Sequence, residues 1–170
     1  MTGGEVFLQF EFAMELCKIL RENGVNIALE TAGVVSTDKF SKLVSLADFI
    51  FIDCKHYDSE RHRQGTGVGN ELILKNIAWL AGSEKKYCVR IPVIPQYNDS
   101  IQDAEEFVRL FKNLGVKEVQ LLPFHQLGEK KYEKLRRNYV YKGVPQLHKE
   151  DLNLIRDIFI KSGLEVAIGG

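Results

Sequence analysis

Residues 49–55 read Phe-Ile-Phe-Ile-Asp-Cys-Lys, an apolar run that ends in two opposite charges. An unbroken run of β-branched and aromatic residues is typical of a strand buried on both faces, as in a parallel α/β sheet. Asp53 and Lys55 are two apart and so share one face of this strand, while Cys54 points the other way. The carboxyl ends of parallel strands are where α/β folds place their sites. An ordinary ion pair at a strand end explains the same residues, and this stretch alone leaves both interpretations open.

The rest of the chain alternates between helical and strand patterns. Apolar periodicity and turn residues predict helices at 8–22, 37–46, 71–80, 101–114 and 148–162, strands at 25–29, 48–55, 87–94, 117–124 and 165–168, and loops at 56–70 and 127–145. This order permits right-handed βαβ crossovers, so the sheet is predicted to be mainly parallel. The first helix has no strand before it, so we expect an upstream part to be missing.

Length and charge restrict the class of protein. The 170 residues fit a single domain, 1–170, with a sizeable core. Lys and Arg number 23, as do Asp and Glu, so no net field favours nucleic acid or an anionic membrane. The apolar runs are too short to span a bilayer and the N-terminus lacks signal-peptide features, so a cytoplasmic protein is expected. The basic, tyrosine-containing stretch 128–142 is interpreted as a solvated loop or partner contact rather than an RNA-binding segment.

The three cysteines, Cys17, Cys54 and Cys88, are too widely spaced for a zinc or cluster loop. An odd number of cysteines also argues against a disulfide framework. All three are predicted to be packing residues inside helices or strands.

Ionisable side chains are predicted at the carboxyl ends of four successive strands. Strand parity groups them into sets, namely Ala28 with Glu30, Phe51 with Asp53 and Lys55, Cys88 with Arg90, and Leu121 with Pro123 and His125. If the sheet curls, one cavity mouth is lined by Glu30, Asp53, Lys55, Arg90 and His125. Mixed charges suit a zwitterionic or polar small molecule better than a purely anionic one. Each residue also has a local explanation, such as a turn cap, an ion pair or a surface histidine.

Six motifs, taken in order, resemble the radical S-adenosylmethionine (SAM) superfamily and, within it, the activases of glycyl radical enzymes of the pyruvate formate-lyase type. They are Gly3-Gly4-Glu5, Leu-Glu-Thr-Ala-Gly at 29–33, Ile-Asp-Cys-Lys at 52–55, Thr-Gly-Val-Gly-Asn at 66–70, Val-Arg-Ile-Pro-Val-Ile-Pro at 89–95 and Leu-Leu-Pro-Phe-His-Gln-Leu-Gly at 121–128. The resemblance implies an α/β fold, a partial (β/α)6 barrel of the TIM-like type. This chain would be its C-terminal two-thirds, truncated at the N-terminus.

The resemblance also implies roles for residues at the barrel mouth. SAM would be bound by Gly3, Gly4, Glu5, Asp53, Cys54, Lys55 and His125, with Gly4 at the methionine ammonium and Lys55 at the carboxylate. A substrate peptide would meet Arg90, Gly67, Val68 and Asn70. A monovalent cation would be held by Glu30, Thr31 and Asp53.

The chemistry implied by the resemblance is reductive cleavage of SAM to make a glycyl radical on a formate-lyase-type partner. It needs a [4Fe–4S] cluster on a Cys-x3-Cys-x2-Cys loop and a flavodoxin- or ferredoxin-type electron donor. The chain contains no such cysteine loop. We therefore expect a radical SAM oxidoreductase as a full-length protein and inactivity for this chain alone.

Two alternatives stay open from the sequence. One is a non-catalytic remnant that binds SAM or a peptide. The other is an unrelated metabolic α/β barrel enzyme that uses Lys55 and His125 as acid and base. If the first two barrel strands are missing, the strand at 25–30 becomes an exposed sheet edge, which predicts self-association.

Overall fold

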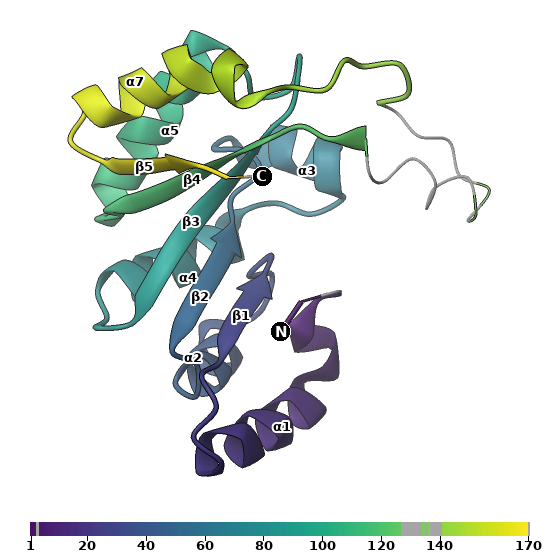
Figure 1. The fold of residues 1–170 in the computed structure, drawn as a ribbon, viewed down its shortest axis with the longest axis vertical. Helices are drawn as coiled ribbons and strands as arrows, with labels where there is room; N and C mark the ends of the chain where they lie inside the picture. Colours follow the sequence, from purple (N-terminus) through teal and green to yellow (C-terminus); the bar gives the residue numbers. More distant parts are fainter. Residues whose placement is uncertain (3, 127–133, 135, 137–140, 170) are drawn as a thin grey trace.

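The fold is described by a computed structural model, which places residues 1–2, 4–126, 134, 136 and 141–169. The described residues form one five-stranded sheet in the order β1-β2-β3-β4-β5 (Figure 1). Every neighbouring pair of strands is parallel, as predicted. The strands are β1 (Ala28–Thr31), β2 (Phe49–Asp53), β3 (Lys86–Val93), β4 (Glu118–Pro123) and β5 (Glu165–Ile168).

The helices follow the sheet as a row of neighbours. α1 contacts α2, α2 contacts α4, α4 contacts α5, and α5 contacts α7, so the row repeats the strand order (Figure 1). Their bounds are η1 (Val6–Gln9), α1 (Phe10–Glu22), α2 (Thr37–Val44), α3 (Ser59–Thr66), α4 (Glu71–Ala81), α5 (Ile101–Leu114), η3 (Lys149–Leu152) and α7 (Asn153–Lys161). Among the described residues, no helix is long and apolar enough to cross a membrane.

In the described part of the chain, helices cover one face of the sheet. Alternate residues of β1 to β4 are buried in the core, including Leu29, Ile50, Ile52, Val89, Ile91, Val119 and Leu121. Most residues between them are only partly buried, including Glu30, Phe51, Asp53, Arg90 and Gln120, whereas Cys88 is buried. A parallel sheet with helices on one face and an open opposite face is the arrangement of a partial barrel, in which the open face is the interior.

The structure corrects two boundaries of the predicted elements. β1 begins at Ala28 instead of residue 25, because the main chain of Ile27 is already bonded to Asp48 and Phe49. The predicted loop at 56–70 contains helix α3. The Asp58 side chain caps this helix by accepting a hydrogen bond from Arg61 N, and Gly67 ends it at a φ of 88°. Apolar periodicity could not reveal α3, since its only buried residue is His62.

The prediction that Leu121 and Pro123 of the fourth strand share the face of the site was wrong. Leu121 and Pro123 lie on the helix-covered face, where Leu121 is fully buried. The register pairs Arg90 with Gln120 and Pro92 with Leu122, so Gln120 lies beside Arg90 on the open face. Because β4 ends at Pro123, the strand alternation could not be extended to His125.

All three cysteines are buried and free, which confirms their prediction as packing residues. Burial raises the pKa of the Cys54 thiol to about 12, and that of Cys88 to about 12 as well. These thiols are therefore protonated at neutral pH and are poor metal ligands.

Candidate functional site

Four charged side chains from three neighbouring strand ends form one network on the open face. Arg90 pairs through Nη1 with Glu30 at 2.9 Å and through Nε with Asp53 at 3.0 Å. The second oxygen of Asp53 accepts a hydrogen bond from Lys55 Nζ at 2.8 Å. Asp53 and Lys55 thus share a face, as predicted. Of the five side chains that were predicted to line one cavity mouth, Glu30, Asp53, Lys55 and Arg90 are joined in this network, and His125 is not part of it.

Arg90 and Glu30 are ionised in spite of the partial burial of the network. The Arg90 side chain is 15% exposed and lies over the ring of Phe51, with 5.1 Å from its Cζ atom to the ring centroid. Burial by itself would lower the pKa of Arg90, but the charge of Asp53 and the contact with Glu30 outweigh it and raise the pKa. The hydrogen bond from the Thr2 hydroxyl, reinforced by Arg90, lowers the pKa of Glu30. Arg90 and Glu30 therefore carry opposite charges at neutral pH.

Three members of the network, Glu30, Asp53 and Arg90, form one wall of a hollow of about 240 Å³, and Lys55 adjoins this wall through its ion pair with Asp53. Its lining residues come from the N-terminal segment and three strand ends, namely Thr2, Gly4, Glu5, Glu30, Thr31, Ala32, Asp53 and Arg90. A Cβ atom added at Gly4 would meet no other atom within 4 Å. Packing within the described protein therefore does not require glycine at this position, and the space beside the Gly4 backbone is open to a ligand. Gly3 lies outside the described residues.

Glu5 ties the N-terminal segment to the end of β1. One carboxylate oxygen accepts a hydrogen bond from the Thr31 hydroxyl at 2.7 Å, and the other accepts from Ala32 N at 2.8 Å. The same hydroxyl accepts a hydrogen bond from Gly33 N at 2.9 Å. Glu5 thus has a clear structural role beside the hollow.

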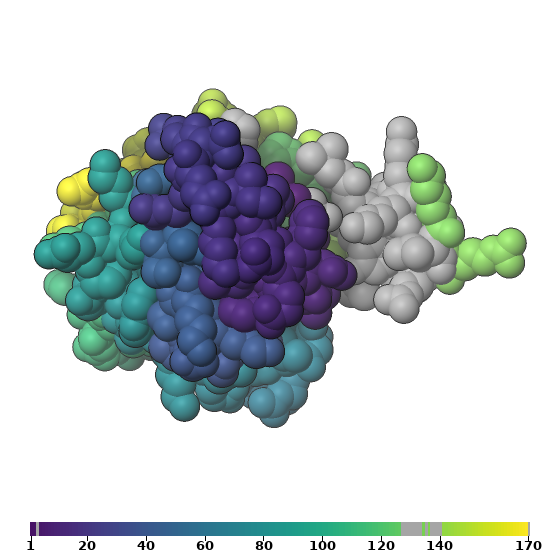
Figure 2. All heavy atoms as spheres, turned by 90° about the horizontal axis from the view of Figure 1, so that it is seen from below, coloured from purple at the N-terminus to yellow at the C-terminus, as the bar shows by residue number. Residues whose placement is uncertain are grey.

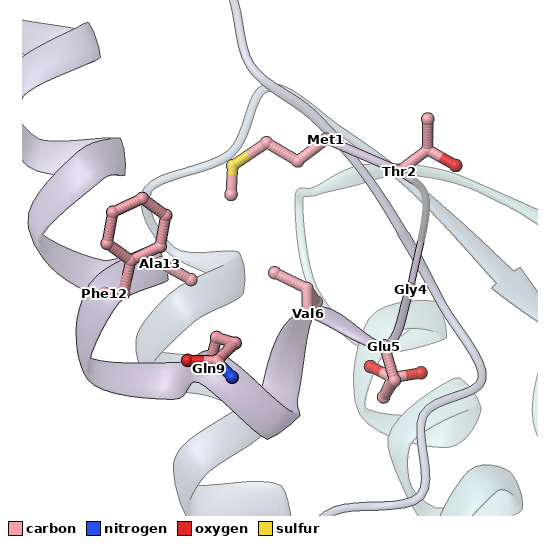
Figure 3. Close-up of a pocket in the computed structure, with 8 residues that line it drawn as sticks. All are labelled: Met1, Thr2, Gly4, Glu5, Val6, Gln9, Phe12 and Ala13. Atoms are coloured by element: carbon pink, nitrogen blue, oxygen red, sulfur yellow. The ribbon is translucent and has the colours of Figure 1, made fainter.

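A second, mostly apolar hollow of about 190 Å³ lies on the other side of the N-terminal segment (Figure 3). Figure 3 shows the Met1 side chain reaching toward Phe12 and Ala13 of α1, while Glu5 points away from it. The purple N-terminal region of the chain faces the viewer in Figure 2. Within this region, Leu8 of η1 and Phe12 of α1 are 80% and 65% exposed. The main chain of Met1 is paired with Ala28 and Glu30, as in a parallel bridge at the outer edge of β1.

The loop at 66–70, which was predicted to face a peptide, is held in place by the buried side chains of His62 and Asn70. His62 Nδ1 lies 2.7 Å from the Val68 carbonyl, which makes Nδ1 the protonated nitrogen. Asn70 is buried and donates to the carbonyls of His56 and Tyr57. Of the predicted peptide contacts, Gly67 and Val68 are at the surface, whereas Asn70 and Arg90 are engaged inside the protein.

Three buried asparagines, two of which the sequence analysis missed, hold the loops that follow β1, β2 and β3. Asn76 of α4 donates to Gly33 O and Val35 O, and Asn98 donates to Lys55 O and Pro92 O. Asn70 supports the loop after β2. A sequence signal existed, because an asparagine within an apolar helix or beside a strand end is typical of a residue that satisfies loop carbonyls.

The remaining predicted residues lie apart from the network. Cys54 is fully buried with its thiol on the helix side, so only its main chain is near the hollow. His125 is exposed beyond β4, and among the described residues no hydrogen bond or ion pair joins it to the four charged side chains. In the same part of the chain, no three His, Cys, Asp or Glu side chains are grouped to hold a metal.

Comparison with known proteins identifies the class. Residues 1–111 match the family model described as the radical SAM superfamily, so the chain belongs to that superfamily. Members use SAM and a [4Fe–4S] cluster, as the resemblance implied. The match excludes the alternative of an unrelated barrel enzyme.

Curated relatives and a solved structure place the chain more narrowly. It is 38% identical over 170 residues to the 4-hydroxyphenylacetate decarboxylase activating enzyme of Clostridioides difficile (strain CD196), covering 99% of this chain and 54% of that protein. It is 32% identical to the pyruvate formate-lyase 2-activating enzyme of Escherichia coli (strain K12), covering 100% of this chain and 58% of that one.

The crystal structure of a domain of pyruvate-formate lyase-activating enzyme from Bacteroides vulgatus ATCC 8482 matches with a TM-score of 0.82 at 26% identity, covering 100% of this chain and 97% of that one. The fold is therefore the predicted partial barrel. The chain spans about half the length of the curated relatives it matches.

Proposed function

We propose that this chain is the SAM-binding and substrate-facing part of a glycyl-radical-enzyme activase. The proposal is carried by the Glu30–Arg90–Asp53–Lys55 network beside the free backbone of Gly4. It is supported by identities of 30–38% to several named activating enzymes. As proposed from the resemblance, residues 1–170 act as one domain and form the C-terminal part of the barrel.

The charges of the network fit the amino-acid end of SAM. Lys55 Nζ is a cation for the methionine carboxylate, held in place by Asp53. The carboxylates of Asp53 and Glu30 are acceptors for an ammonium or for ribose hydroxyls. Gly4 leaves room for the ammonium, Gly3 and Glu5 flank it, the main chain of Cys54 lies next to Lys55, and exposed His125 is assigned to the ribose or adenine. Bound SAM supplies the radical chemistry of the superfamily, while these residues bind and orient it.

The described residues do not fit the cluster. Its thiolates need low pKa values and close spacing, whereas Cys17, Cys54 and Cys88 are buried and burial raises the pKa of each. We therefore assign no cluster ligand to this chain, and no redox step is derived from it.

A glycyl radical enzyme is the proposed partner, because the relatives are named as activating enzymes of such proteins. Gly67 and exposed Val68 are proposed to contact the peptide directly. Asn70 and Arg90, which are engaged inside the protein, are proposed to support this contact. A flavodoxin- or ferredoxin-type donor and a cytoplasmic location stay predictions. Self-association, which was predicted to occur through the sheet edge at residues 25–30, also stays a prediction. Because the main chain of Met1 is paired with that edge at Ala28 and Glu30, we propose instead that it occurs through the apolar surface of Leu8, Phe12 and Ile19.

A cation held by Glu30, Thr31 and Asp53 also stays a prediction. Arg90 already pairs with both carboxylates, and the Thr31 hydroxyl is engaged with Glu5 and Gly33. A bound cation would have to displace part of this network.

Gly4→Ala tests the SAM site without disturbing the fold. The new methyl group meets no protein atom within 4 Å, so the melting temperature should not change. If SAM binds against this backbone, its affinity in the complete, cluster-reconstituted polypeptide that carries this chain should fall by roughly tenfold or more. Gly82→Ala is the matched control, because its Cβ atom makes only ordinary contacts of 3.6 Å or longer at the end of α4. Unchanged affinity in Gly4→Ala would contradict the proposal.

A further inference from the structure

Asn98 connects the loop after β3 to the main chain of Lys55. It lies in the Pro-Gln-Tyr-Asn turn that leads into α5, and it is only 3% exposed. Its Nδ2 donates to Lys55 O at 2.8 Å and to Pro92 O at 2.9 Å. Its Oδ1 accepts from Ile94 N at 2.7 Å. Both donors of the amide group and its oxygen are thus used to join two strand ends.

The residues that follow Lys55 are held in the same way. The next two carbonyls, those of His56 and Tyr57, accept hydrogen bonds from Asn70 Nδ2 at 3.0 and 2.8 Å. Three consecutive carbonyls, at positions 55–57, therefore receive donors from two buried asparagines. The carbonyls of a segment that has just left its strand have no inter-strand hydrogen bonds within the sheet. The side-chain amides of the two asparagines supply the hydrogen bonds in their place.

The position of Lys55 Nζ depends on this main-chain support. Lysine has a long flexible side chain, and among the described residues only Asp53 restrains the tip of the Lys55 side chain, which is 32% exposed. Asp53 is itself held in place by Arg90. The position of the Lys55 ammonium group therefore still depends on the conformation of the Lys55 main chain. The Asn98 amide fixes that conformation.

We propose that Asn98 is a positioning residue for SAM binding: it fixes the main chain of Lys55 so that the ammonium group meets the methionine carboxylate. Asn70 supports the same segment one residue further on. This inference rests on the proposed function, because it takes Lys55 to be the carboxylate contact.

The test is a double-mutant cycle on SAM affinity in the complete, cluster-reconstituted polypeptide, measured by anaerobic calorimetry at pH 8. Asn98→Asp keeps the acceptor for Ile94 N and the side-chain shape, but it removes the donors to Lys55 O and Pro92 O. It should weaken SAM binding on the order of tenfold in the native background. In the Lys55→Ala background it should cause no further loss, since the side chain that it positions is gone.

Asn76→Asp is the matched control. Asn76 is equally buried and also donates to two loop carbonyls, but it supports the loop after β1 and has no bond to the Lys55 segment. Whatever its effect on affinity, it should be additive with Lys55→Ala. This contrast separates positioning of Lys55 from a general loss of loop structure.

The outcomes are distinguishable. Equal weakening by Asn98→Asp in both backgrounds, or none in either, overturns the positioning role while leaving the proposed function standing. If Lys55→Ala alone leaves SAM affinity unchanged, the carboxylate assignment and this inference both fail. If circular dichroism shows that Asn98→Asp is unfolded, Asn70→Asp takes its place in the same cycle, with the same results deciding.

Discussion

Arg90 Nε lies 3.0 Å from Asp53 Oδ1, and the two residues are direct partners in the parallel register of β2 and β3. The carboxylate therefore stands between two cations, since its other oxygen pairs with Lys55. Because this pair is mostly buried, its loss should affect folding as well as ligand binding.

Asp53→Asn should lower the free energy of unfolding by about 2 kcal/mol. Removing one member of a fully buried pair costs about 3–5 kcal/mol, and the partial exposure of this pair reduces that figure. Asp38→Asn is the control, because Asp38 pairs with Lys42 at 2.9 Å on the surface with side chains 73% and 59% exposed. That pair should contribute less than about 0.5 kcal/mol. Equal urea midpoints for the two variants would contradict the prediction.

Glu5→Gln should loosen the N-terminal segment. The amide can accept only one of the two hydrogen bonds that now come from Thr31 and Ala32, so the free energy of unfolding should fall by about 1–2 kcal/mol. Amide hydrogen exchange should rise in residues 4–9. The exposed Glu105 of α5 makes no hydrogen bond among the described residues, and Glu105→Gln should leave exchange in this segment unchanged.

The cysteines should be inert in the folded protein. Burial raises the pKa of both Cys54 and Cys88 to about 12, and Cys17 is also fully buried. Ellman's reagent at pH 7.5 should therefore label no cysteine in the native chain and all three in urea. Rapid labelling of any cysteine without denaturant would show that the core around it opens readily.

His56 should make stability fall as the pH drops below about 6.5. Burial lowers its pKa, with the charge of Arg61 adding to the effect. Above pH 6.5 the imidazole is neutral in both states. Below that pH, His56 is protonated in the unfolded chain but stays neutral in the folded chain. The free energy of unfolding therefore falls by up to about 1.4 kcal/mol per pH unit until the pKa of His56 in the folded state is reached.

Urea unfolding between pH 7.5 and 5.5 measures this slope. His56→Gln should flatten it, whereas His125→Gln, at an exposed position, should not. An unchanged slope in His56→Gln would assign the pH dependence to other groups. Protonation of Glu30 affects stability at a lower pH than protonation of His56, because the hydrogen bond from Thr2 lowers the pKa of Glu30 below the ordinary value for glutamate.

Self-association should depend on the apolar surface of α1 and η1. Leu8, Phe12 and Ile19 are 80%, 65% and 55% exposed, which is unusual for such side chains on one side of a helical segment. Sedimentation velocity at increasing concentration should show dimers or larger species that Phe12→Glu suppresses. Leu154→Glu is the control, because Leu154 is 69% exposed on α7. A native chain that stays monomeric at high concentration would refute the prediction.

The sequence alone determined the order of elements, the parallel sheet and the placement of Asp53 and Lys55 on one face. Each follows from local periodicity, since alternation along a strand and repetition along a helix depend only on neighbouring residues. The burial of Cys54, on the opposite face of the same strand, followed for the same reason. The charged network was also within reach, because the ends of parallel strands must meet at one edge of the sheet.

Only the tertiary structure decided which side chains join across that edge. The face on which Leu121 lies depended on the register of β4 against β3. The helix α3 depended on a capping side chain and on the burial of His62, and neither produces an apolar periodicity in the sequence. The bond from Asn98 to Lys55 O joins residues 43 apart. A side-chain amide can satisfy any carbonyl within reach, so its partner is chosen by how the strands bring the loops together, and a linear sequence does not contain that distance.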